Sequence, residues 1–267
     1  MSNISHARVS SNAPYSEGVL NRSDDATIRS ALARIPTTAA LDLLKEQDPC
    51  QLVLSNVKTL FPLEGSIAGR ARTLRFLPTR VDYRKAPGEP PNFRLLDATQ
   101  PGDFLIFDAQ GWPRGSVLGD MLALRAKING AVGVATDGVM RDLVGLEGVG
   151  LPVFATSTFP VPSAPTLVAW EADVPVQCGG ALVVPGDWIL ADRDGVIVIP
   201  ERWVNDVIDG FEIFTKEEQF CRALLLDGLS LHQAYPMPPA IRPLFERYLS
   251  DGRLPSEAEV LKANGGH

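Results

Sequence analysis

The chain has 267 residues, of which 45% are hydrophobic and 21% charged, and this composition excludes a wholly disordered protein. Its formal net charge of −7 argues against unspecific nucleic-acid binding, because contacts to phosphates need clustered cations. The chain contains three histidines, His6, His232 and His267, two of which lie near the ends. A histidine-ligated zinc centre or a Ser-His-Asp triad is therefore a poor candidate, since each needs a well-placed imidazole.

The cysteines and the N-terminus predict a cytoplasmic protein. Cys50, Cys178 and Cys221 are far apart and form no CxxC pair, so we expect small buried side chains in a reducing compartment. The polar N-terminus lacks the apolar core of a secretory signal, and no apolar run is long enough to span a membrane. We therefore expect a small-molecule partner, with no membrane and no nucleic acid.

The first third of the chain predicts mainly helices and one strand. The expected elements are a flexible tail over 1–22, helices over 24–34 and 39–46, a strand over 65–77 and a proline-rich loop over 78–94. Pro36 ends the first helix, and Thr37 or Thr38 is the expected N-cap of the second.

The middle of the chain predicts a parallel strand-helix-strand unit. The expected elements are strands over 103–108, 131–136 and 151–155, a turn over 111–115, a helix over 117–129 and a brief helical segment over 139–143. Gly130 follows the longer helix at the position where glycine commonly ends a helix. Such a unit joins parallel strands through a crossover helix.

The last third predicts a strand meander followed by helices. Short Val/Ile strands separated by Gly, Pro and Asp turns fill residues 166–200, and helices are expected over 201–226, 241–249 and 256–263. The predicted organisation is a tail over 1–22, one domain over 23–235 and a C-terminal helical extension over 236–267.

Two segments carry the residues that suit chemistry. The turn over 115–120 precedes a helix, whose unpaired N–H groups can hold a carboxylate or phosphate; its glycines do not match the dinucleotide fingerprint, and a plain turn is the alternative. Arg141 and Asp142 follow the second strand of the unit, at the sheet edge where ligands gather. Arg suits a carboxylate ligand and Asp suits Mg²⁺ or Mn²⁺. The alternative is a surface salt bridge of Arg141 with Asp137 or Asp142.

Other polar residues favour structural roles. We expect Asp187, Asp192 and Asp194 to be turn residues, although they also resemble a metal cluster, and Trp112 to be a packed aromatic. An arginine series either attracts an acidic substrate or pairs with carboxylates at a subunit contact; its members are Arg70, Arg72, Arg75, Arg80 and Arg84.

The stretch GSVLGDMLALRAKINGAVGVATDGVMRDL, residues 115–143, resembles the signature of the RraA-like family. That family includes divalent-metal 4-hydroxy-4-methyl-2-oxoglutarate aldolases and proteins named as regulators of ribonuclease activity. Its aldolases have an Asp, twenty intervening residues and then Arg-Asp, the spacing of Asp120 and Arg141-Asp142. Residues 37–42, 69–78 and 175–200 also resemble the family, so the likeness extends over roughly 30–235.

The resemblance implies an α/β protein with a three-layer β/β/α swivelling-domain-like fold and helical N- and C-terminal extensions. It implies a homotrimer or hexamer with sites at subunit interfaces. Arg141 and the backbone around Gly119, Asp120, Met121 and Leu122 would bind the substrate. Asp142 would bind Mg²⁺ or Mn²⁺, and Asp120 would orient a water for proton transfer. A neighbouring subunit would supply an acid, for which Glu217 and Glu218 are the candidates.

The resulting prediction is a metal-dependent carbon-carbon lyase. It would cleave a 2-oxo acid, such as 4-hydroxy-4-methyl-2-oxoglutarate or oxaloacetate, through a pyruvate-type enolate stabilised by the cation and Arg141. One alternative is a non-catalytic regulator that binds a ribonuclease or helicase; another is a dehydratase or decarboxylase of a sugar-derived acid. One departure is visible: the family often has an acidic residue shortly after Arg-Asp, whereas this chain has Leu143-Val144-Gly145.

Overall fold

The computed structural model describes residues 24–45, 48–82, 88–164 and 166–265, so the tail predicted over 1–22 lies outside the described residues. The helices are α1 Asp25–Leu32, α2 Thr37–Leu43, α3 Pro91–Asp97, α4 Asp120–Ile128, α5 Leu143–Val149, α6 Val204–Leu226, α7 Leu231–Ala234, α8 Arg242–Asp251 and α9 Glu257–Ala263. The strands are β1 Lys58–Thr59, β2 Ile67–Pro78, β3 Asp103–Asp108, β4 Ser116–Leu118, β5 Gly133–Thr136, β6 Val139–Met140, β7 Val153–Ala155, β8 Ser157–Thr158, β9 Leu167–Ala172, β10 Val176–Cys178, β11 Ala181–Val183, β12 Trp188–Ala191 and β13 Val196–Ile199.

The main sheet runs in the order β1-β7-β5-β3-β2-β12-β13, and β9 also pairs with β2. The strands β2, β3, β5 and β7 are parallel neighbours, as the predicted strand-helix-strand unit requires. The sheet curls until its edges approach each other: residues 52–54 hydrogen-bond to β13, and β1 a few residues later pairs with β7. The predicted mixed α/β class is confirmed, with a nearly closed, barrel-like sheet.

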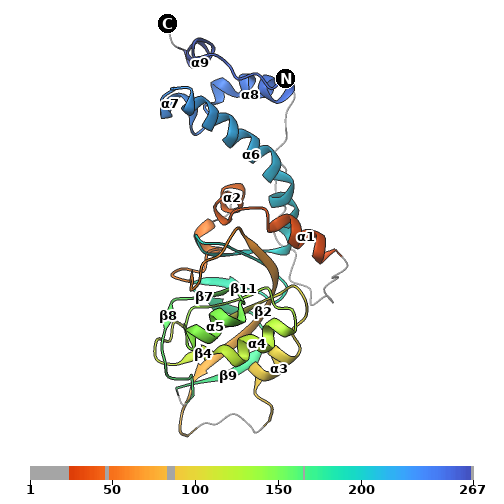
Figure 1. Cartoon of the computed structure of the whole chain (residues 1–267), viewed down its shortest axis with the longest axis vertical. Coiled ribbons are helices and arrows are strands. Elements are labelled where there is room, and N and C mark those ends of the chain that lie inside the picture. Colours follow the sequence, from red (N-terminus) through yellow and green to blue (C-terminus); the bar gives the residue numbers. More distant parts are fainter. Residues whose placement is uncertain (1–23, 46–47, 83–87, 165, 266–267) are drawn as a thin grey trace.

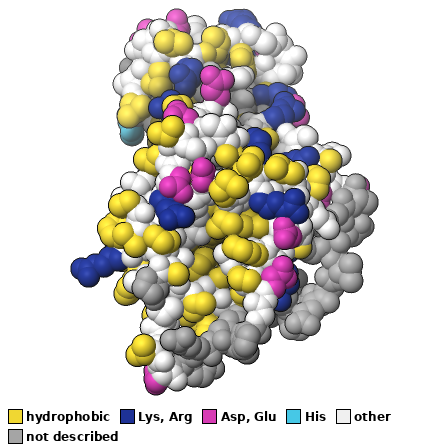
Figure 2. Space-filling view, turned by 60° about the horizontal axis from the view of Figure 1, so that its bottom comes forward, with side chains coloured by type: hydrophobic (Ala, Val, Ile, Leu, Met, Phe, Trp, Pro, Cys, Tyr) yellow, Lys and Arg dark blue, Asp and Glu magenta, His cyan; other side chains and the backbone are white. Residues whose placement is uncertain are grey.

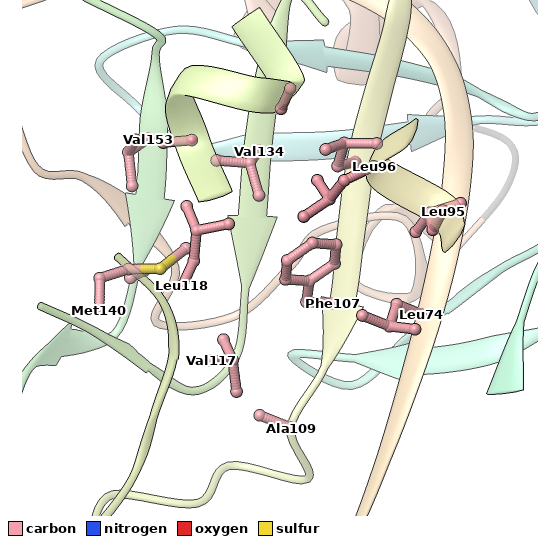
Figure 3. Packing of buried hydrophobic residues seen from close by; sticks show 14 of the residues in the cluster. Leu74, Leu95, Leu96, Phe107, Ala109, Val117, Leu118, Val134, Met140 and Val153 are labelled. Atoms are coloured by element: carbon pink, nitrogen blue, oxygen red, sulfur yellow. The ribbon is translucent and has the colours of Figure 1, made fainter. Parts of the chain in front are cut away.

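Two hydrophobic cores lie on the two sides of the central strands. Helices α3, α4 and α5 cover one side (Figure 1), and Phe107, Leu118 and Val134 point toward one another beneath them (Figure 3). The other core fills the inside of the curl, where Phe104 and Ile106 of β3 meet residues of β10, β11 and β12. All six residues of β3 are buried, as expected for a parallel strand packed on both faces.

The N- and C-terminal helices form two further clusters. Helices α1 and α2 and the first half of α6 pack over β12 and β13. The second half of α6 extends away from the sheet and packs with α7, α8 and α9 at the far end of the molecule (Figure 1). In the part of the chain that the structure describes, no helix is long and apolar enough to cross a membrane.

Three predicted boundaries are wrong for local reasons. Residues 139–143 do not begin a helix, because Val139–Met140 is the central strand β6 of a small sheet and α5 begins at Leu143. The helix expected from residue 117 begins at Asp120, since Ser116–Leu118 forms strand β4 of that sheet. The loop expected over 78–94 ends early, because α3 begins at Pro91. Proline is favourable at the first position of a helix, where a backbone N–H would have no partner within the helix.

The cap predicted for the second helix is also wrong. Helix α2 begins at Thr37, and the residue at its N-cap is Pro36. Thr37 donates from its backbone N–H and its hydroxyl to the Asp192 carboxylate, at 2.7 and 2.8 Å. Its side chain is used to join the helix to the turn between β12 and β13 and not to cap the helix.

Candidate active site

A small parallel sheet places the two predicted site segments beside each other. Strand β6 pairs with β4 on one side and with β8 on the other. Strand β4 leads directly into Gly119 and α4, and β6 leads into Arg141-Asp142 and α5. The Arg141 N–H donates to the Leu118 carbonyl at 3.2 Å. The structure therefore brings together Gly119, Asp120, Arg141 and Asp142, as the carboxyl-end rule for parallel strands predicts.

The contact between the segments depends on a glycine. A Cβ on the buried Gly119 would overlap the Asp142 carboxylate oxygen Oδ2 and lie 3.2 Å from Arg141 Nε. The missing side chain is what lets the Arg-Asp pair approach the start of α4. The Gly119 carbonyl accepts the hydrogen bond from Ala123 N, so the N–H groups of residues 120–122 precede the first helical bond of α4.

Asp142 has an unusual backbone. Its φ of 61° and ψ of 44° lie in the left-handed region, where a non-glycine residue costs about 1 kcal/mol or more. Its carbonyl accepts the first helical hydrogen bond of α5, from Leu146 N at 2.8 Å. The chain therefore turns sharply at Asp142, and the carboxylate oxygen Oδ2 lies over Gly119.

Arg141 and Asp142 also contact each other, as the salt-bridge alternative predicts. Arg141 Nε lies 3.2 Å from Asp142 Oδ2, and the side chains are 37% and 42% exposed. A pair this exposed contributes little to stability, so the contact does not by itself explain why both residues are here. Both side chains line a surface hollow of about 370 Å³. They are accessible to a small ligand.

The hollow has a wall that the sequence did not reveal. Thr158, Phe159 and Pro160 line it together with the segment from Met140 to Gly145. They are placed there because β8 pairs with β6 and Phe159 N donates to the Met140 carbonyl at 2.8 Å. A two-residue strand has no periodicity, so the sequence offered no signal for this wall.

Asp120 is fixed at the first residue of α4. Its Oδ1 accepts a hydrogen bond from Met121 N at 2.7 Å. This places a carboxylate at a helix N-terminus, where the helix dipole favours negative charge. The Met121 N–H, which was predicted to bind substrate, therefore donates its hydrogen bond to Asp120. The backbone N–H groups of Asp120 and Leu122 are left to bind an anion at the start of α4.

A divalent cation fits this donor set only with water completing its shell. Among the described residues, no group of three His, Cys, Asp or Glu side chains could hold a metal. Asp142 offers one half-exposed carboxylate. Magnesium keeps several waters and often binds through one or two carboxylates, so a single Asp at an open hollow is compatible with it.

Glu217 and Glu218 do not reach this hollow in their own chain. Both lie on α6 and line a different groove, beside α2 and the segment from Tyr235 to Arg242. Glu217 pairs with Arg242 at 3.1 Å. None of the described residues lining the Arg141-Asp142 hollow comes from α6.

The carboxylates expected in turns are confirmed there. Asp192 accepts hydrogen bonds from Thr37 and from Asp194 N, and Asp187 accepts one from Val184 N at 2.8 Å. Burial raises the pKa of Asp187 to about 6. Trp112 is packed against the core, as expected.

The arginine series mainly pairs with carboxylates. Arg70 contacts Asp25 and Glu201, Arg72 contacts Asp103 and Asp173, and Arg80 contacts Asp82. Arg75 donates to the Pro175 carbonyl, and Arg84 lies outside the described residues. Arg70, Arg72 and Arg80 therefore pair with carboxylates, but they do so within their own chain.

Sequence reasoning did not single out Asp108. Burial raises its pKa to about 6, and burial also raises the pKa of Asp137. Asp108 accepts from Gln110 N at 3.0 Å, and Asp137 accepts from Ala109 N and Gly111 N at 2.8 and 3.1 Å. These bonds hold the turn after β3, so both carboxylates have a structural role.

Comparison with known proteins places this site in a family. The family model described as RraA-like, Aldolase/RraA, matches residues 37–198. A Thermus thermophilus protein named 4-hydroxy-4-methyl-2-oxoglutarate aldolase is 33% identical over 165 residues, covering 62% of this chain and 92% of that protein.

Solved structures agree on the fold. Streptomyces coelicolor RraAS2, described as an unusual member of the RNase ES inhibitor RraA protein family, aligns with a TM-score of 0.67 and 33% identity, covering 74% of this chain and 96% of that chain. An uncharacterized Pseudomonas syringae protein shares the fold, with a TM-score of 0.66, 22% identity and coverage of 78% and 96%. The family model spans Gly119, Asp120, Arg141 and Asp142. The chain belongs to the RraA-like family.

Proposed function

We propose that the protein is a divalent-metal-dependent lyase that releases pyruvate from a 2-oxo acid. The observation that supports this most directly is the contact of Gly119-Asp120 with Arg141-Asp142, the second pair of which lines an open hollow. A relative that is 33% identical is named 4-hydroxy-4-methyl-2-oxoglutarate aldolase, which supports aldolase-type chemistry. That acid and oxaloacetate are the proposed substrates, because cleavage of either leaves the same pyruvate enolate.

Each residue has a role that suits its chemistry. Arg141 would bind the substrate carboxylate, together with the free N–H groups at the start of α4. Asp142 would hold Mg²⁺ or Mn²⁺, which when bound stabilises negative charge on the 2-oxo oxygen. Asp120 would orient a water and move a proton, since its position is fixed by Met121 N. No imidazole and no lysine are required, which agrees with the shortage of histidine.

Self-association fits the surface around the site. Large apolar side chains on α4 and α5 are exposed: Met121 is 71% exposed, Ile128 65% and Val144 88%. Met121, Leu124 and Ile128 follow a helical spacing and form one apolar stripe on α4. Hydrophobic side chains also gather across the middle of the face shown in Figure 2. We propose a homotrimer or hexamer in which a neighbouring subunit faces the hollow and supplies Glu217 or Glu218.

The lyase proposal is tested by measuring pyruvate release from a panel of 2-oxo acids in the presence of Mn²⁺. The panel contains 4-hydroxy-4-methyl-2-oxoglutarate, oxaloacetate and a sugar-derived 2-oxo acid, each with an enzyme-free control. The expected result is release from the first two and a loss on the order of a hundredfold or more in kcat/KM for Arg141→Met. No release above the enzyme-free rate from any acid contradicts the proposal.

A regulatory role is the second candidate, because the Streptomyces relative of 33% identity is described as belonging to an RNase inhibitor family. That role needs a protein surface and does not need the Asp120, Arg141 and Asp142 side chains. Co-purification of this protein with a ribonuclease, unchanged in a triple Ala variant of those residues and without any lyase activity, would favour it.

A further inference from the structure

The start of α5 packs against the start of α4 through a second glycine. An ideal Cβ at Gly145 would lie 2.6 Å from both Cβ and Oδ2 of Asp120, and 2.9 Å from its Cγ. Distances this short do not occur between real side chains, so the two segments would have to separate. Asp120 therefore rests directly on the Gly145 backbone.

This contact mirrors the one already described. Asp142, at the start of α5, rests on Gly119, at the start of α4; Asp120, at the start of α4, rests on Gly145, in the first turn of α5. Each carboxylate thus occupies the space left by a missing side chain in the opposite segment. Separating the helix starts would displace both carboxylates.

The other glycine of α5, Gly148, shows that the close contact with α4 is specific to Gly145. Helix α5 contains Gly145 and Gly148, and a Cβ at Gly148 would meet nothing within 4 Å. Glycine inside a helix costs about 1 kcal/mol relative to alanine, so neither is favoured by helix stability. The absence of a side chain at Gly145 allows the close approach of Asp120, whereas Gly148 has no such contact.

We propose that Gly145 is a positioning residue, which sets the place of the Asp120 carboxylate relative to Arg141 and Asp142; this rests on the proposed function. It explains the absence of an acidic side chain just after the Arg-Asp pair. The carboxylate of Asp120 itself fills the space beside Gly145. Displacement of a reacting group by about 1 Å is enough to slow a reaction on the order of a hundredfold.

The test compares Gly145→Ala with Gly148→Ala in the full chain. We expect Gly145→Ala to lower kcat for pyruvate release on the order of tenfold to a hundredfold, with a much smaller change in KM. Gly148→Ala should keep the wild-type kcat and melt at the same or a higher temperature. Equal kcat values for the two variants overturn the proposal.

A double-mutant cycle separates positioning from a general folding defect. Asp120→Gly removes the three atoms that would lie nearest to a Cβ at residue 145. Gly145→Ala should therefore lower the melting temperature in the wild-type background but leave it unchanged or raise it in the Asp120→Gly background, as Gly148→Ala does. The same loss in both backgrounds overturns the proposal.

The two proposals fail in different ways. If wild-type protein releases no pyruvate, the proposed function and the catalytic consequence of Gly145 are both overturned. The melting temperatures in the double-mutant cycle still test whether Gly145 and Asp120 are in contact, because they do not depend on enzymatic activity.

Discussion

At the scale of single residues, the sequence predicted which side chains lie at the site but not the contacts between them. The Asp120 and Arg141-Asp142 segments could be placed together because they follow the predicted strands over 103–108 and 131–136, and parallel strands end at the same edge. The contacts of Gly119 and Gly145 could not be predicted, since they depend on how two helix starts pack. The strand over 103–108 was expected to be buried, but the raised pKa that this burial gives to Asp108 was not predicted.

We predict that Asp108 makes stability fall as pH rises from about 4 to about 6. Burial raises its native pKa to about 6, above the ordinary value of 3.8, so the native state binds the extra proton in this window. Above pH 6 the buried carboxylate is charged, and its desolvation lowers the free energy of unfolding. Asp108→Asn is neutral at every pH and should melt higher than wild type at pH 8.

Melting curves of both proteins between pH 5 and pH 8 check this. The advantage of Asp108→Asn should shrink toward pH 5, where the wild-type carboxyl is largely protonated. An advantage that is constant with pH, or a wild type that is favoured at pH 8, would contradict the role given to burial.

Elements were predicted best where a pattern is long or uniformly apolar. The strand over 103–108 agrees with β3, and the meander over 166–200 contains β9 to β13. The short elements failed: β4, β6 and β8 have two or three residues each, too few for a period. They matter most for the site, because this small sheet aligns its two segments.

Arg70 joins three elements and gives an element-scale prediction. Its side chain on β2 is 4% exposed, stacks on Trp188 and contacts Asp25 of α1 and Glu201 just before α6. We expect Arg70→Met to lower the free energy of unfolding by about 3 kcal/mol, because it leaves the mostly buried Asp25 carboxylate without its cation.

Arg80→Ala is the matched control. Its pair with Asp82 is exposed on both sides, at 69% and 68%, so its removal should leave the free energy of unfolding nearly unchanged. Urea unfolding of both variants decides this. Equal losses for Arg70→Met and Arg80→Ala would show that Arg70 does not hold the terminal helices to the sheet.

At the scale of the whole molecule, the resemblance supplied most of the fold prediction. Local patterns predicted strands and helices, whereas the curl of the sheet depends on distant pairings, such as Val53 with Ile197. Helices α8 and α9 were expected from their patterns; that they pack on the second half of α6, away from the sheet, was not.

Self-association through α4 and α5 is the prediction at this scale. Val144 is 88% exposed on α5, so Val144→Lys places a charge on the proposed interface. We expect this variant to sediment at a lower mass than wild type. Leu182→Lys, at a 63% exposed residue of β11, should keep the wild-type mass.

A wild type that sediments as a monomer would contradict the assembly. A Val144→Lys variant of unchanged mass would show that Val144 at the start of α5 is not in the interface.

The dependence of pyruvate release on a divalent cation at Asp142 is the most direct test. Wild-type protein and Asp142→Ala are treated with a chelator, dialysed and assayed with oxaloacetate before and after Mn²⁺ is added, with the rate of Mn²⁺ alone subtracted. The account predicts that the chelator abolishes wild-type activity, that Mn²⁺ restores it, and that Asp142→Ala stays inactive throughout. Full activity without a metal, or full activity of Asp142→Ala, would contradict it.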